Sequence, residues 1–148
     1  EGGFKVVTLA SLHHALDLEA TLRAVHRVLK PQGVFYAVGE QTRGLLRHRN
    51  PGADEIERFG WNEHAYSRAE YGDAFRKAGF DYAIPVPASI GARLEKGVYG
   101  TSAANRLLGS LASPFWRFAT FRAIFGTLVF PVAQPLLGLS MVIRATKP

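Results

Sequence analysis

The chain has 148 residues, of which 47% are hydrophobic and 20% are charged. This composition is typical of one small globular domain and is too apolar for a disordered chain. The absence of cysteine excludes disulfides, cysteine-ligated zinc, iron–sulfur clusters and a thiol nucleophile. The chain opens at Glu1 with no basic-then-apolar leader, so we expect a processed product or a piece of a longer protein.

Charge is unevenly distributed along the chain. The formal net charge is +6, yet all 12 acidic residues lie within residues 1–96. Residues 97–148 are therefore both basic and apolar. Because their charges are sparse and form no stripe, we expect an anionic partner or a membrane surface and no nucleic acid, with ordinary solvated side chains as the alternative. The basic residues there are Arg106, Arg117, Arg122, Arg144 and Lys147.

The first predicted elements are a buried strand over residues 4–12 and an amphipathic helix of about 13 residues. The strand is a short apolar run rich in β-branched residues. Asp17 is a natural N-cap for the helix. The inner face of the helix is predicted to hold Leu22, Val25, Val28 and Leu29.

A second strand follows this helix after a short turn. Pro31 ends the helix, and we expect Gly33 to adopt the left-handed conformation of the turn. Residues 34–38 then read as another buried strand. A strand, a helix and a strand joined by such short links predict a βαβ unit with a parallel strand pair.

Another helix and an edge strand are predicted after a polar stretch. Ser67 caps the helix and Gly79 ends it. Residues 80–86 read as a strand whose two prolines, Pro85 and Pro87, favour the edge of a sheet. The inner face of the helix is predicted to hold Tyr71, Phe75 and Ala78.

Residues 90–138 are too many for a plain loop and carry helix signals of their own. Ser102 is predicted to cap a helix over residues 103–111. Ser113 and Pro114 are predicted to begin a second helix that reaches about Val129. A last strand is predicted over residues 139–146.

Residues 123–143 form an uncharged run as long as a membrane span. We expect no span, because Pro131, Pro135 and Gly138 interrupt the run and its end fits a strand better. An apolar helix over a pocket or on a membrane face stays open beside ordinary core packing.

Residues 4–40, FKVVTLASLHHALDLEATLRAVHRVLKPQGVFYAVGE, resemble the second half of class I S-adenosylmethionine-dependent methyltransferases. The family pattern there is a strand beginning Phe-Asp-Val-Val, a Leu-His-His exit, a helix ending Arg-Val-Leu-Lys-Pro-Gly-Gly and a strand ending in an acid. Residues 62–80, NEHAYSRAEYGDAFRKAGF, are similar to the family's next helix. The resemblance implies an α/β, Rossmann-like sheet, here the partial C-terminal half, with residues 90–138 as a helical insertion in a single partial domain over residues 1–148.

The sequence departs from the family pattern in two small ways and one large way. Lys5 replaces the family's Asp, and Gln32-Gly33 replaces Gly-Gly; we expect neither to alter the fold, because Gly33 alone can make the turn. The family's glycine-rich cofactor loop occurs nowhere, and the chain begins at what would be the fourth strand. We therefore expect the 148-residue chain alone to bind S-adenosylmethionine weakly or not at all.

Ligands of open α/β sheets lie at the carboxyl ends of the strands, which here selects the residues after the first two predicted strands. By the resemblance, Ala10, Ser11, Leu12 and His13 would line the methionine end of the cofactor. His14 is the candidate general base, because imidazole takes up a proton near neutral pH. The alternative is that the two histidines only pack at the start of the helix.

Three further residues are candidates for binding the acceptor. Glu40 ends the second predicted strand and could orient the acceptor or hold a cationic one, with a solvated strand end as the alternative. His64 and Tyr66 lie in a polar cluster before a helix, where helix capping is an equally good explanation. No histidine pair or carboxylate has metal-ligand spacing, so we expect no metal.

We expect an S-adenosylmethionine-dependent methyltransferase acting on a small apolar acceptor, with a cytoplasmic location. The alternatives are a non-catalytic half-domain that binds a partner chain or a membrane surface peripherally through its last third, and a different nucleotide-binding α/β protein. We also expect assembly: the strand over residues 4–12 lacks the neighbour it has in the family, and a bare apolar edge favours a homodimer or association with the missing N-terminal half.

Overall fold

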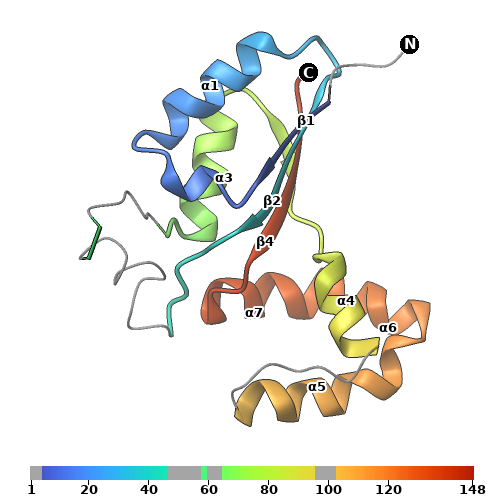
Figure 1. The fold of residues 1–148 in the computed structure, drawn as a ribbon. Coiled ribbons are helices and arrows are strands. Elements are labelled where there is room, and N and C mark those ends of the chain that lie inside the picture. The colour runs from blue at the N-terminus through green and yellow to red at the C-terminus, as the bar shows by residue number, and fades with distance from the viewer. Residues whose placement is uncertain (1–4, 47–57, 60–64, 96–102) are drawn as a thin grey trace. The chain divides into compact units, whose positions relative to one another are not determined.

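The computed structural model describes residues 5–46, 58–59, 65–95 and 103–148 (Figure 1). They form two compact units. The first unit combines residues 1–85 with residues 133–148, and the second comprises residues 86–132. The predicted insertion over residues 90–138 therefore overlaps most of the second unit.

The first unit is built on a four-stranded sheet with the order β1-β2-β4-β3. β1 and β2 pair in parallel, which confirms the predicted βαβ unit. β4 lies antiparallel between β2 and β3, and β3 is an edge strand as predicted, although it ends at Ala83, before Pro85 and Pro87. The strands are β1 (Lys5–Leu9), β2 (Val34–Glu40), β3 (Asp81–Ala83) and β4 (Met141–Thr146).

Two helices, α1 (Leu18–Val28) and α3 (Arg68–Lys77), cover the same face of this sheet (Figure 1). Apolar side chains from both helices meet those of β2 and β4 in one continuous core. The predicted inner face of α3 is confirmed, but Val28 of α1 is 75% exposed, because it projects from a different side of the helix than the buried Leu22 and Leu29. The fully buried core residues include Leu22, Phe35, Phe75 and Ile143.

The predicted caps of α1 and α3 are present, whereas Ser102, predicted to cap a later helix, lies outside the described residues. The Asp17 carboxylate accepts a 2.9 Å hydrogen bond from Ala20 N at the start of α1. Ser67 and Glu70 form a reciprocal capping box at the start of α3, in which each side chain accepts from the other residue's backbone N–H. Gly79 follows α3 with φ of +89°, as a left-handed helix end requires.

The turn before β2 differs from the prediction. Gln32, and not Gly33, has the left-handed conformation, with φ of +61°. Gln32 N donates to Lys147 O at 2.9 Å, and Lys147 N donates to Gly33 O at 3.0 Å. These bonds continue the β2–β4 pairing into the turn. They hold Gln32 in a left-handed conformation that glycine would adopt with less strain.

The second unit is helical and centres on Trp116, which is 6% exposed. Its indole ring lies edge-on to Phe125 at 5.2 Å between ring centroids, and Gly91 leaves room for the indole nitrogen. The helices are α4 (Ala88–Glu95), α5 (Ala103–Trp116), α6 (Ala119–Ile124), the π turn η2 (Phe125–Val129) and α7 (Phe130–Leu137), whose second half belongs to the first unit.

Two sequence predictions about these helices are wrong. Ser113 and Pro114 do not begin a helix: α5 runs through both and ends two residues after Pro114, which lacks the N–H that would bond the carbonyl four residues earlier. The helix that begins at Ala119 also does not stop near Val129 but continues to Leu137 through Pro131 and Pro135. The π turn bonds Phe130 N to Phe125 O, and this wider turn directly before Pro131 makes room for its ring.

Among the described residues one helix, Ala119–Leu137, is long and apolar enough to cross a membrane. The prolines therefore do not interrupt it as the sequence suggested. Its last turn, however, is fixed in the first unit. Gln134 is fully buried there and donates to Thr42 Oγ1 at 2.9 Å, and Pro135 O accepts from Leu45 N at 3.0 Å.

Candidate active site

The loop that leaves β1 begins with an unusual backbone conformation. Ala10 has φ of +45°, and its N–H donates to Val38 O in β2 at 2.8 Å. A single 3-10 turn, η1 (Leu12–His14), follows and leads to Asp17 and α1. The loop thus starts at the carboxyl end of β1 and stays beside the carboxyl end of β2.

Glu40, the last residue of β2, fixes this loop through hydrogen bonds to its backbone. Its Oε1 accepts from Ser11 N at 3.2 Å and from Leu12 N at 3.3 Å. Its Oε2 accepts from His13 N at 3.3 Å and lies 3.1 Å from His13 Nδ1. An ionised carboxylate can only accept, so Nδ1 of His13 carries the proton in this contact.

A β-bulge aims the Glu40 side chain inward. The register between β2 and β4 shifts between Val38 and Glu40, and Gly39 between them has φ of +75°. A bulge re-aims the side chain that follows it, and Glu40 is fully buried as a result. The three backbone N–H groups and the imidazole compensate the cost of burying a carboxylate.

Tyr71 of α3 completes the network around Glu40. Its hydroxyl donates to Glu40 Oε2 at 3.4 Å, and the side chain is fully buried. Burial and the nearby Glu40 carboxylate hold the pKa of Tyr71 far above its usual range, so the phenol stays protonated and remains a donor. Sequence reasoning placed Tyr71 only in the core. The signal was its hydroxyl, because a buried tyrosine on the inner face of a helix needs a polar partner.

The structure brings Ala10, Ser11, His13, His14 and Glu40 together at one edge of the sheet. Ala10, Ser11 and His14 are exposed, whereas His13 is buried together with its neighbour Leu12. The His13 and His14 rings are in contact, with centroids 4.2 Å apart. Glu40, predicted to hold or orient the acceptor, uses both of its oxygens on the loop.

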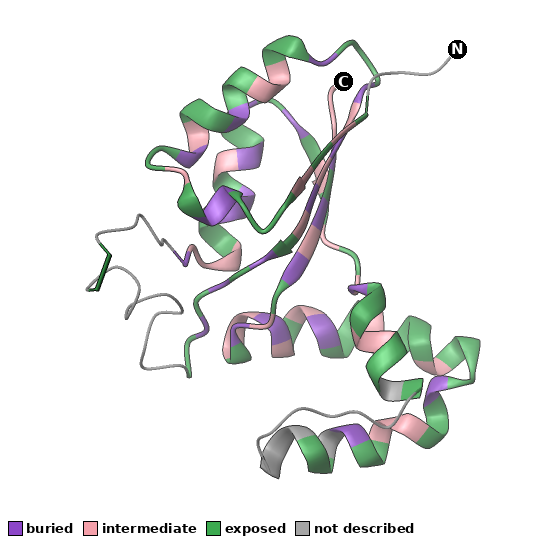
Figure 2. Cartoon of the chain, viewed as in Figure 1, coloured by how far each residue is buried: buried purple, intermediate pink, exposed green. Residues whose placement is uncertain are grey.

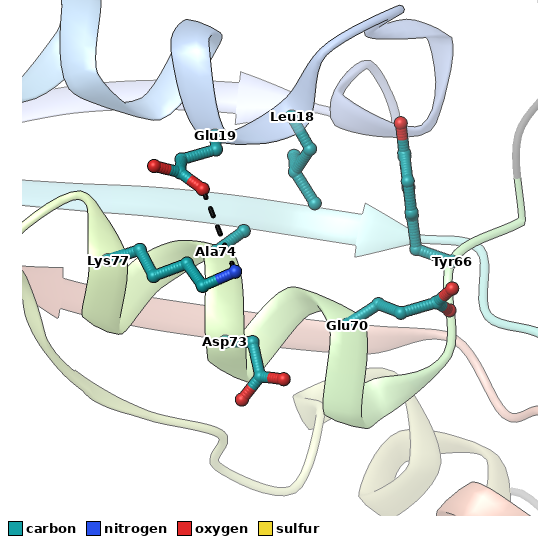
Figure 3. A pocket seen from close by; sticks show the side chains of 7 residues that line it. All are labelled: Leu18, Glu19, Tyr66, Glu70, Asp73, Ala74 and Lys77. Carbon is teal, nitrogen blue, oxygen red and sulfur yellow. Dashed lines mark ion pairs between the residues drawn. The ribbon is translucent and has the colours of Figure 1, made fainter.

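Tyr66 lies next to this loop, at one end of a hollow of about 220 Å³ between α1 and α3 (Figure 3). Its hydroxyl donates to Ala15 O at 2.8 Å. Burial, with smaller effects of Asp17 and Glu70, raises the pKa of Tyr66. The hollow is lined mainly by charged side chains of the two helices and contains neither His14 nor Glu40. It is lined by Leu18, Glu19, Tyr66, Glu70, Asp73, Ala74 and Lys77.

Two other predictions, His64 as an acceptor-binding residue and the absence of a metal, are not tested by the described residues. His64 lies outside the described residues. Within the part of the chain that the structure describes, no group of three or more His, Cys, Asp or Glu side chains could hold a metal ion. The absence of a metal stays a prediction for the whole chain.

The fold is that of known methyltransferases. A solved structure of Haemonchus contortus phosphoethanolamine N-methyltransferase 2 in complex with S-adenosyl-L-methionine matches with a TM-score of 0.54 and 13% identity, over 97% of this chain and 33% of that chain. A chain of the complex between the Haloferax volcanii Trm112 methyltransferase activator and a methyltransferase matches with a TM-score of 0.50 and 19% identity, over 97% of this chain and 54% of that chain. No curated protein sequence matches.

The chain therefore spans about a third to a half of the length of these solved chains. The family model of the methyltransferase domain matches residues 2–37, which run from β1 through α1 into β2. These residues form the parallel strand pair and the loop that Glu40 holds. Residues 2–37 thus match the methyltransferase-domain family, and the chain has part of the fold of these solved methyltransferases.

Proposed function

We propose that the domain to which this chain belongs transfers a methyl group from S-adenosylmethionine to a small apolar acceptor at the carboxyl edge of β1 and β2. Ligands of open α/β sheets bind at this edge. The observation that carries the proposal is the Glu40 network, which fixes three consecutive backbone N–H groups of the loop after β1. A loop held this firmly can present its outer residues to a ligand at little entropic cost.

The loop has exposed residues that can contact the cofactor and buried residues that support them. Ala10 and Ser11 are exposed and can contact its methionine end, and the small side chain of Ala10 permits a close approach. Leu12 and His13 are buried and support the loop from beneath. When bound, S-adenosylmethionine supplies an electrophilic methyl group on a sulfonium. The chain itself contributes placement and exclusion of water, from which methyl transfer gains most.

His14 is the proposed general base. Its imidazole is exposed next to the His13 ring, which the Glu40 carboxylate holds in place. His14 is therefore available to an acceptor at the sheet edge, and its neighbour limits where the ring can lie. A general base in such a position accelerates a proton abstraction by about 10²- to 10⁴-fold.

The test uses the complete protein and a panel of small apolar compounds with methyl-labelled S-adenosylmethionine. His14→Ala should lower turnover by about 10²-fold or more and leave cofactor affinity nearly unchanged. His26→Gln, in the last turn of α1 and so at the opposite end of that helix from the loop, is the control and should retain turnover. Unchanged turnover in His14→Ala would return His14 to a packing role. Failure of the complete protein to bind S-adenosylmethionine would contradict the proposed function and favour a non-catalytic half-domain.

A further inference from the structure

Most of the described residues in the helices of the second unit are exposed (Figure 2), and large apolar side chains recur among them at regular spacing. On α5, Leu107, Leu111 and Phe115 are spaced four residues apart and are 53–61% exposed. On the helix that begins at Ala119, the same spacing gives a second row, which is 48–67% exposed. Side chains four residues apart share one face of a helix. The second row consists of Ile124, Leu128 and Val132.

The unit that carries these rows contains several basic side chains and almost no acidic ones. Residues 86–132 contain five basic side chains and only Glu95 as an acid, a formal charge of +4. Arg106 and Arg117 are exposed next to the α5 row. The Arg117 guanidinium lies over the Phe118 ring, 4.9 Å from its centroid, and Phe118 is itself 50% exposed. Aromatic rings beside cationic groups are typical of protein segments at the membrane–water interface.

We infer that the second unit docks on the surface of an anionic lipid bilayer, with its apolar rows in the interface and its arginines at the headgroups. Charge complementarity favours this occupant: a basic surface with little acid is attracted to anionic lipid, and the apolar rows add burial that a free anion could not provide. The inference does not depend on methyl transfer, although a lipid surface is also a source of apolar acceptors.

The helix lies on the bilayer and does not cross it. Because Gln134 and the turn around it are fixed in the first unit, only residues 119–132 are available for lipid, well short of the roughly 20 residues that a span requires. Arg122 also binds the carbonyls of Trp116 and Arg117, which holds its charge at the start of this segment. An interfacial position satisfies both constraints, since the polar groups stay in the headgroup region.

Flotation of the full chain with vesicles tests the inference. Phosphatidylcholine vesicles are compared with vesicles that contain phosphatidylglycerol in addition. We expect the affinity for the anionic vesicles to be higher by about fivefold for each arginine near the surface. Arg106→Gln/Arg117→Gln should lower the affinity for the anionic vesicles by about 25-fold, whereas Arg27→Gln in α1 should leave it nearly unchanged. Equal binding to both vesicles, or binding to neither, would overturn the inference.

The apolar rows are tested with asparagine substitutions of their aliphatic residues. Ile124→Asn/Leu128→Asn and Leu107→Asn/Leu111→Asn should each lower vesicle affinity by roughly tenfold. Leu16→Asn/Leu45→Asn is the control, because both leucines are at least 80% exposed in the first unit. Circular dichroism verifies that every variant is folded. If the row variants instead convert a dimer to a monomer in light scattering and leave vesicle binding unchanged, a second copy covers the rows and the inference is wrong.

Discussion

Similar apolar side chains are buried in the first unit of the chain and exposed in the second. In the first unit Leu22, Phe35, Phe75 and Ile143 are completely buried between two helices and a sheet. In the second unit leucines at the same kind of helical spacing, such as Leu111, are more than half exposed. Helical periodicity therefore predicts a face but not what covers it. The cover depends on whether a sheet or another helix lies opposite.

The sheet of the first unit shows the same contrast on a smaller scale. Alternate residues of β1 point to opposite faces, and the face away from α1 and α3 leaves Val7 58% and Leu9 72% exposed. β1 is also the last strand on its side of the described sheet. We propose, as the sequence suggested, that another chain segment pairs with this edge, because a bare apolar edge promotes association.

The largest expected effect on stability compares a buried apolar side chain of the first unit with an exposed one of the second. Phe75→Ala should lower the free energy of unfolding by about 3–5 kcal/mol, because it leaves a cavity among Phe35, Phe80 and Tyr82. Leu111→Ala in the second unit should change it by less than about 0.5 kcal/mol, because little apolar area is lost. Chemical denaturation measures both. Equal costs would mean that the second unit buries its rows as well as the first.

The next largest effect on stability compares a buried carboxylate with an exposed one. Glu40→Gln should cost about 2 kcal/mol, because the amide group donates toward backbone N–H groups that need an acceptor. Glu19→Gln, which removes an exposed pair with Arg23, should cost no more than about 0.5 kcal/mol. In hydrogen exchange, Glu40→Gln should also expose the amides of residues 11–13. Intact protection there would show that the loop does not depend on Glu40.

A smaller effect of opposite sign is expected at the turn before β2. Gln32→Gly should raise the free energy of unfolding by about 0.5–1 kcal/mol, because glycine adopts the left-handed conformation without strain. Gln41→Gly is the control: Gln41 has no left-handed conformation to relieve, so only the added freedom of the unfolded chain remains and stability should fall slightly. Thermal unfolding compares the two variants. A loss of stability in Gln32→Gly would mean that the Gln32 side chain contributes contacts that outweigh the strain.

The smallest effect concerns pH. Burial, and next the charge of Lys147, lower the pKa of His26 in the folded protein below its ordinary value of about 6.5. The unfolded chain then binds a proton more readily, so the stability contributed by neutral His26 is complete above pH 6.5 and is lost as the pH falls toward the folded-state pKa. His26→Gln should flatten the decline between pH 7 and pH 5. Parallel profiles of the two proteins would contradict this.

Much of the fold follows from local signals in the sequence, and the failures have identifiable causes. The caps at Asp17 and Ser67 and the edge position of β3 were predictable, because each depends on one residue and its neighbours. The course of the helix through Pro131 was not, because a π turn absorbs the ring and no short pattern announces such a turn.

The site was predictable in place but not in detail. The resemblance and the strand ends together indicated residues 10–14 and Glu40, which the structure brings to one edge. The inward turn of Glu40 depends on the bulge at Gly39 and on Tyr71, which lies 31 positions farther along the chain. The hydroxyl of a buried tyrosine indicates a polar partner but not which one, because contacts over such separations are set by packing.

Hydrogen–deuterium exchange of the complete protein, with and without S-adenosylmethionine, tests the central claim most directly. The account predicts added protection at the amides of residues 10–14, where exposed Ala10 and Ser11 would meet the cofactor above the Glu40 network. The helices of the second unit should be unchanged in the same experiment. Protection confined to the hollow beside Tyr66, or no change at residues 10–14 in a protein that binds the cofactor, would contradict the account.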